Sequence, residues 1–205
     1  MTGFVFSLGL MMVMIAGSEL FTGNNMMVIG LYEKKITILQ VLKNWGLVWI
    51  ANLMGTVFIA WLIVFGADLT NNPIGKTALI TADLKTSLSY TQMFTRGILA
   101  NWLVCIAVIM AIASKDISGK ILSIIFPIMA FVASSFEHSI ANMYLITAGL
   151  FTKLIHPYGV NYLSLTYLNG LINLIIVSLG NIIGGGFFVS TLYWFSYHKS
   201  QDKTV

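Results

Sequence analysis

Polar and charged residues divide the chain into five long apolar stretches. They cover residues 3–29, 45–65, 94–113, 121–151 and 168–195. A helix needs about 20 apolar residues to cross about 30 Å of hydrocarbon, and each stretch reaches that length. None shows the alternation of apolar and polar residues that a membrane-spanning barrel strand requires. The pattern therefore predicts an all-α, polytopic membrane protein with five spans.

The composition supports this membrane location. Hydrophobic residues make up 58% of the 205 residues, charged residues make up 9%, and the mean hydropathy is +0.88. Such a chain is not a soluble enzyme, a disordered tail or a fibrous repeat. The 11 basic and 7 acidic residues form no nucleic-acid-binding cluster, and the single cysteine, Cys105, excludes a disulfide framework and a cysteine-based zinc site. We expect no cofactor, no metal and no nucleic-acid partner.

The basic residues predict the orientation of the spans. Seven lie in the loops after the first and third spans and in the C-terminal tail, against four on the opposite side. Because Lys-rich and Arg-rich loops stay in the cytoplasm, we expect a multi-pass protein of the inner (cytoplasmic) membrane with a cytoplasmic C-terminus. The first residue then lies outside, with no charge before Glu19 to orient the chain. Two explanations are open: a signal peptide over residues 1–17, or an absent first span.

An internal repeat favours the absent span. Residues 52–58 and 181–187 both read N-x-x-G-x-x-F, and upstream of each a polar interruption ends in Asn-Met, at residues 25–26 and 142–143. An inverted repeat needs an odd number of spans in each unit, so the first unit would lack its first span. We therefore expect one transmembrane channel domain over residues 1–205, with a partial first repeat (1–66), a connecting extracellular segment (67–91) and a second repeat (92–196).

Polar side chains interrupt two of the spans, at residues 17–25 and 134–142. Such groups are tolerated at membrane depth only where they are buried in protein or line a cavity. Half-helix N-termini that meet at the midplane carry partial positive charge, which suits an anion or a polar solute. We expect His138 to face that solute, although a buried histidine that only joins two helices is the alternative. Four residues are expected to organise the breaks: Glu19, Asn25, Glu137 and Asn142.

Three segments resemble the formate/nitrite transporter family of anion channels. They read Leu20-Phe-Thr-Gly-Asn-Asn25, Asn101-Trp-Leu-Val-Cys105 and Phe136-Glu-His-Ser-Ile-Ala-Asn-Met143. The resemblance covers essentially the whole chain. It implies an aquaporin-like inverted repeat of six spans, of which this sequence lacks the first, and a homopentamer in the lipid bilayer with one pore per subunit.

The resemblance also assigns roles to individual residues. It implies that His138, Thr22 and Asn101 lie at the centre of the pore and that Lys85 attracts anions below the outer vestibule. The alternative for Lys85 is an amphipathic stretch at the membrane interface. The alternative for the apolar residues is ordinary helix packing. The resemblance implies hydrophobic constrictions at Phe6, Leu10, Leu20, Phe21, Val104 and Phe131.

The expected function is passive or proton-coupled passage of a small weak-acid anion. A bare anion between apolar side chains loses hydration worth on the order of tens of kcal/mol in the idealised limit, so transient protonation near His138 offers a cheaper route. Formate, nitrite and hydrosulfide remain open as substrates. One alternative is an aquaporin-like facilitator of neutral solutes, although the chain has no Asn-Pro-Ala signature. We do not expect an enzyme, because no nucleophile or metal set accompanies Glu137 and His138.

Overall fold

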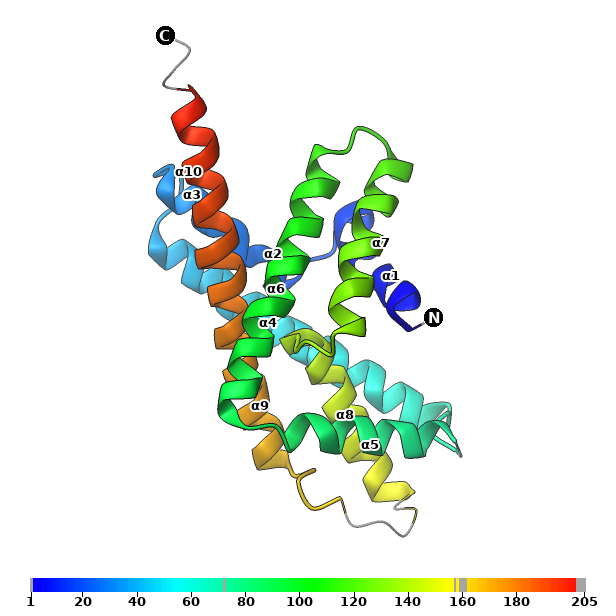
Figure 1. Cartoon of the computed structure of the whole chain (residues 1–205). Helices are drawn as coiled ribbons and strands as arrows, with labels where there is room; N and C mark the ends of the chain where they lie inside the picture. The colour runs from blue at the N-terminus through cyan, green and yellow to red at the C-terminus, as the bar shows by residue number, and fades with distance from the viewer. Residues whose placement is uncertain (1, 72, 157, 159–161, 202–205) are drawn as a thin grey trace.

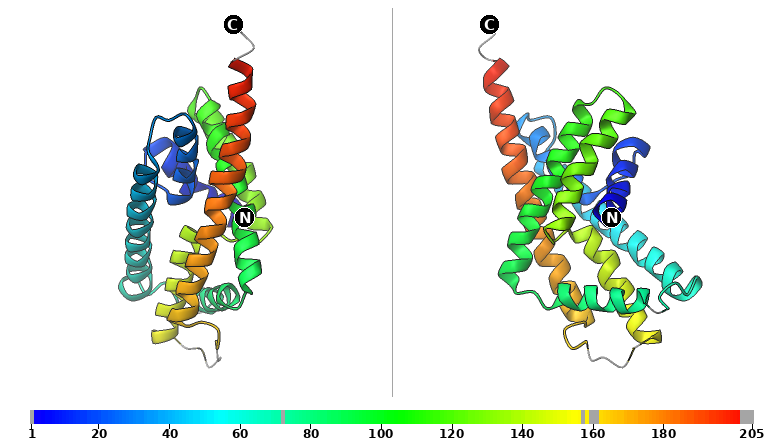
Figure 2. Two further views of the ribbon diagram at one scale, coloured as in Figure 1. Left: turned by 90° about the vertical axis from the view of Figure 1, so that its left-hand side faces the viewer. Right: turned by 45° about the vertical axis from the view of Figure 1, so that its right-hand side comes forward.

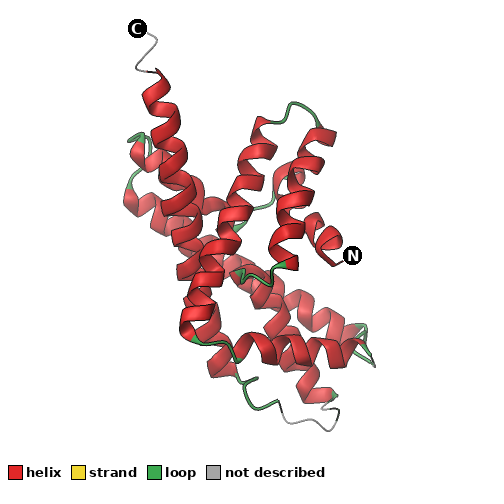
Figure 3. Cartoon of the chain, viewed as in Figure 1, coloured by secondary structure: helices red, strands yellow, loops and turns green. Residues whose placement is uncertain are grey.

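The computed structural model describes residues 2–71, 73–156, 158 and 162–201, and every regular element within these ranges is helical (Figure 3). The predicted all-α fold is therefore confirmed. Figure 1 labels the helices, whose bounds are α1 (Thr2–Ala16), α2 (Phe21–Asn24), α3 (Val28–Tyr32), α4 (Ile38–Trp61), α5 (Ile74–Thr86), α6 (Tyr90–Ala113), α7 (Ile117–Ala133), α8 (Ser139–Ile155), α9 (Tyr167–Ile182) and α10 (Ser190–Gln201).

All five apolar stretches are helical, but they are built in two ways. Three contain long helices: α4 with a π-helical turn (Leu62–Gly66), α6, and α9 continued through a π-helical segment (Ile183–Val189) into α10. By length and composition, these three can cross a membrane. The first stretch bends by 59° between α1 and α2–α3, and the fourth consists of the two shorter helices α7 and α8. The two polar interruptions are therefore real breaks in the helices.

The breaks are shorter than the sequence predicts. Only residues 17–20 and 134–138 lie outside helices, because helical structure resumes at Phe21 and at Ser139. Each new half-helix therefore begins inside its polar segment, and its N-terminus lies at the break. In both cases the residue before the half-helix, Leu20 or His138, has an extended backbone and occupies the N-cap position.

The helix α5 lies within the predicted connecting segment 67–91. Figures 1 and 2 show it running across one end of the molecule, at the end opposite α10 and the C-terminus. It packs against α8. The chain then turns at Ser89, whose hydroxyl accepts from the backbone N–H of Gln92 while the Gln92 side chain accepts from the Ser89 backbone. This reciprocal cap starts α6 at a defined residue.

Small residues bring α6 and the α9–π-helical span into backbone contact. A Cβ added at Gly184 would lie 2.3 Å from the carbonyl oxygen of Ile98, and one at Gly180 would lie 2.4 Å from that of Phe94. Real Cβ atoms do not approach backbone so closely. Glycine is therefore required at both positions for this helix pair to form, as at close helix contacts in membranes generally.

We expect Gly184→Ala to lower the free energy of unfolding by about 2 kcal/mol, because overpacking against backbone cannot be relieved by a rotamer change. The matched variant is Gly46→Ala on α4, where a Cβ meets nothing within 4 Å. Thermal unfolding in detergent, followed by tryptophan fluorescence, measures both. Equal melting temperatures for the two variants would contradict the predicted backbone contact.

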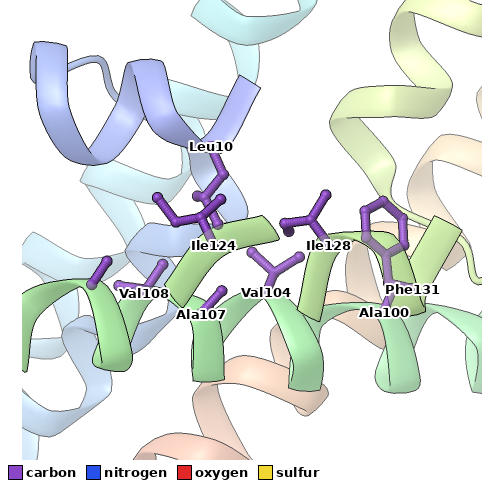
Figure 4. Close-up of a cluster of buried hydrophobic side chains, with 9 residues drawn as sticks. Leu10, Ala100, Val104, Ala107, Val108, Ile124, Ile128 and Phe131 are labelled. Atoms are coloured by element: carbon purple, nitrogen blue, oxygen red, sulfur yellow. The ribbon is translucent and has the colours of Figure 1, made fainter. Parts of the chain in front are cut away.

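The largest cluster of buried apolar side chains lies between α1, α6 and α7. Figure 4 shows side chains from these three helices converging, with Leu10 meeting residues of α6 and α7. The members of the cluster are Leu10, Ala100, Val104, Ala107, Val108, Ala111, Ile124, Ile128 and Phe131. Their packing holds the first half of each broken span against α6, and so places the two breaks close to each other.

Candidate functional site

A cavity of about 230 Å³ lies where the two broken spans meet α6. Its walls are almost entirely apolar. Six of the predicted pore residues line it: Phe6, Leu10, Leu20, Val104, Phe131 and His138. Five further residues that the sequence did not single out also line it: Gly9, Ile128, Ile140, Ala141 and Tyr144. The imidazole of His138 is thus a polar group at the edge of a hydrophobic space.

The ring of Phe131 lines the cavity beside His138. The ring centroids of Phe6 and Phe131 lie 5.5 Å apart in an edge-to-face arrangement, and that of Phe131 lies 5.9 Å from the imidazole. Edge-to-face packing is a favourable geometry for aromatic pairs. The phenyl rings therefore form a stable apolar boundary beside the imidazole.

The two ring nitrogens of His138 have different partners. Nδ1 accepts a hydrogen bond from the backbone N–H of Ala141 at 3.2 Å, and so caps α8. Nε2 lies 2.8 Å from Oγ1 of Thr22, in the half-helix α2 that follows the other break. A backbone N–H can only donate, so Nδ1 carries no proton in this arrangement. The neutral ring then holds its proton on Nε2 and donates it to the threonine hydroxyl.

Thr22 and Asn101 lie behind His138 rather than on the cavity wall. Both are fully buried, and neither lines the cavity. The amide nitrogen of Asn101 donates to the backbone carbonyls of Thr22 (3.2 Å) and Asn181 (2.7 Å). Asn101 therefore joins α2 to α9 and fixes Thr22 where its hydroxyl meets the imidazole.

A buried polar cluster supports the second break. The ammonium of Lys85 lies 2.9 Å from Oε1 of Glu137, and their side chains are 15% and 4% exposed. Asn142 Nδ2 donates to Glu137 Oε2 (2.6 Å) and to Asn173 Oδ1 (2.8 Å). From α9, Asn181 donates to the carbonyl of Glu137 and accepts from the backbone N–H of Ser139. The Asn181 side chain thus satisfies two backbone groups of the break, as burial requires.

The first break has the same set of hydrogen bonds. Asn24 Nδ2 donates to Glu19 Oε2 (2.5 Å) and to Asn44 Oδ1 (2.9 Å). From α4, Asn52 donates to the carbonyl of Glu19 and accepts from the backbone N–H of Phe21. Each bond has its counterpart in the second break, with Glu137, Asn142, Asn173 and Asn181 in the places of Glu19, Asn24, Asn44 and Asn52. The internal sequence repeat therefore corresponds to a pattern of hydrogen bonds that occurs at both breaks.

These bonds place the repeat one residue away from the alignment that the Asn-Met pairs suggest. The structure gives the role expected of Asn25 to Asn24. Asn25 is fully buried, and neither atom of its amide has a hydrogen-bond partner among the described residues. The signal that finds the correct register is the spacing: E-x₄-N begins at both Glu19 and Glu137, and N-x₇-N begins at both Asn44 and Asn173.

The sequence profile of the family described as "Formate/nitrite transporter" matches residues 1–195. The chain belongs to this family. The predicted resemblance is thereby confirmed.

Named relatives and solved structures of the family agree with this placement. The chain is 46% identical to the "Probable formate transporter" of Methanothermobacter thermautotrophicus, over 96% of this chain and 74% of the relative. It is 37% identical to the "Formate channel FocA" of Escherichia coli (strain K12), over 98% and 74%. A solved "Pentameric formate channel with formate bound" superposes with a TM-score of 0.84 at 33% identity, over 95% of this chain and 81% of that one.

Like Thr22 and Asn101, two further residues that the family resemblance assigns to the pore do not line the apolar cavity. Phe21 is buried and contacts Trp45, with ring centroids 6.5 Å apart, and it does not line the cavity. Lys85 lies against Glu137, so the carboxylate offsets much of the positive charge expected to attract anions. Neither residue lines the apolar cavity.

Proposed function

We propose that this family member conducts small monovalent weak-acid anions across a membrane, passively or coupled to protons, with formate as the first candidate and nitrite and hydrosulfide as the others. The observation that carries the proposal is the hydrogen-bonded pair of His138 and Thr22 at the edge of an apolar cavity. The names of the relatives, two of them formate transporters or channels, support the choice of formate.

The apolar walls favour passage of the acid in its neutral form. A bare anion in this cavity would lose most of its hydration and find few polar groups in exchange. Protonating a carboxylate of pKa about 3.5 at pH 7 requires about 5 kcal/mol, because each unit is worth about 1.4 kcal/mol. This free energy is smaller than the free energy needed to desolvate a charge in the idealised limit. Transient protonation is therefore the cheaper route.

The proton that neutralises the anion is relayed through water in this proposal. It is not stored on the imidazole of His138. Nδ1 of His138 is used in capping α8, so a second ring proton would break that bond. The proton on Nε2 already has an acceptor in Thr22. The imidazole can therefore donate to the permeating species only by exchanging its bond to Thr22. The proton is relayed from bulk water through water that enters with the anion, so no hydroxide is left in the cavity.

Assembly and topology complete the proposal. We propose a homopentamer with one conduit per subunit, in the inner membrane, with the C-terminus cytoplasmic. The solved pentameric formate channel supports the assembly, and the excess of basic residues on the side of the C-terminus supports the orientation. The inverted repeats are proposed over residues 1–66 and 92–196, in agreement with the matched bonds of the two breaks.

A facilitator of neutral solutes is the second candidate, because the apolar cavity admits small neutral molecules. Purified protein in liposomes distinguishes the two. We expect formate uptake that accelerates as the external pH falls, and no added permeability to water or glycerol, both measured by stopped-flow light scattering. Water or glycerol flux without anion flux would overturn the proposed function. Parallel runs with nitrite and hydrosulfide rank the substrates.

A further inference from the structure

A second cavity, of about 370 Å³, lies beside the second break on the α5 side of the molecule. It is formed by the end of α5, the start of α6 and the non-helical residues after α7. It is more polar than the first cavity and carries charged groups. Its lining residues are Thr81, Leu84, Lys85, Ser87, Leu88, Arg96, Ser135 and Glu137.

Arg96 gives this cavity a net positive charge. Lys85 and Glu137 form an ion pair there, so their charges offset each other. Arg96 is half-buried, and no carboxylate of the described residues lies within ion-pair distance of its guanidinium. Its own carbonyl accepts from the backbone N–H of Glu137 at 3.3 Å, which holds this turn of α6 against the break. The guanidinium is therefore a cation with no paired carboxylate among the described residues, on a turn of α6 that is bonded to the break.

The same cavity contains a strained backbone position. Ser135 has a φ of 52°, in the left-handed region that a residue with a Cβ rarely adopts. Neighbouring turns impose it, because Ser135 N donates to the carbonyl of Val132 and Phe136 N donates to that of Phe131. Strain of this kind gathers at sites where a backbone must present groups in one arrangement. Here it directs Ser135 to the cavity that contains Arg96.

The two cavities approach each other across the break. Ser135 and Glu137 line the second cavity, and the next residue, His138, lines the first. Consecutive residues of the break, Glu137 and His138, thus border the two cavities.

We propose that Arg96 holds the anion at a binding site that precedes the apolar cavity, on the α5 side of the protein. The inference rests on the proposed function, and it adds a residue and a location. A guanidinium presents two parallel N–H groups that match a carboxylate or another small oxyanion, whereas the lysine beside it is already paired. The site raises the local concentration of the charged form, which then loses its charge at the break.

The test is the concentration dependence of formate uptake in liposomes with one protein orientation, assigned by protease removal of a C-terminal tag. For Arg96→Gln we expect a half-saturating concentration about tenfold higher from the α5 side, with the maximal rate unchanged, because a bidentate charged contact is lost. The half-saturating concentration of Arg96→Lys is expected to lie between those of the wild type and of Arg96→Gln. High salt is expected to reduce the difference in half-saturating concentration between the wild type and Arg96→Gln, since it screens the charge of Arg96.

The matched control is Lys115→Gln, which removes the same charge from an exposed position that lines neither cavity. It is expected to behave as wild type. An unchanged half-saturating concentration in Arg96→Gln, or a lowered maximal rate with a lowered melting temperature, would overturn the inference. If the wild-type protein passes no anion at all, the proposed function fails, and that result is distinct from either outcome for Arg96.

Discussion

Replacing His138 by alanine is expected to lower formate flux by about tenfold or more at neutral pH. Alanine removes the hydrogen-bond acceptor that caps α8 and the donor that meets Thr22. Loss of a cap is worth about 1 kcal/mol, and loss of a hydrogen bond to a buried partner is worth about 1–3 kcal/mol. Because about 1.4 kcal/mol corresponds to a factor of ten, the lost hydrogen bond gives the expected loss of flux, whereas the lost cap lowers stability. Stopped-flow uptake in liposomes measures it.

The matched variant is His138→Asn, which separates hydrogen bonding from proton storage. An asparagine side chain can cap α8 and can donate a hydrogen bond, but it does not titrate. If water supplies the proton, this variant keeps most of the flux and its acceleration at low pH. Loss of flux equal to that of the alanine variant would show that the imidazole itself must carry the proton. Wild-type flux in the alanine variant would remove His138 from the mechanism altogether.

Replacing Glu137 by alanine is expected to be the most destabilising of these substitutions. It leaves the ammonium of Lys85 mostly buried with no carboxylate, and it removes an acceptor from Asn142. Breaking a buried ion pair by removing one partner lowers stability by about 3–5 kcal/mol. Thermal unfolding in detergent and the yield of folded protein report the change.

The internal repeat supplies the control for this prediction. Glu19 occupies the equivalent place in the first break, but it is exposed and accepts one side-chain hydrogen bond, from Asn24. Glu19→Ala is therefore expected to change stability little. The double variant Lys85→Met with Glu137→Met is expected to recover part of the loss, because no unpaired charge then remains. Equal losses for Glu137→Ala and Glu19→Ala would contradict the role of the ion pair.

Comparison of the two breaks shows which features of the fold can be predicted from the sequence. Apolar length predicts the five helical stretches, and polar residues at membrane depth predict where two of them break. The pairing of Asn25 with Asn142 fails by one residue, because two adjacent asparagines offer two alignments and only hydrogen bonds distinguish them. The E-x₄-N spacing resolves this choice, but its meaning depends on knowing that the amide reaches back to the carboxylate.

The linear sequence by itself determined the membrane class, the helical spans and the positions of the breaks, because these depend on the length and polarity of continuous segments. Only the tertiary structure decided that His138 meets Thr22, 116 residues away, and that Lys85 is paired with Glu137. It also placed Phe21 and Asn101 behind the cavity wall. Such contacts depend on how helices pack and rotate against one another, and two residues of the same polarity at the same depth can face either the cavity or the interior.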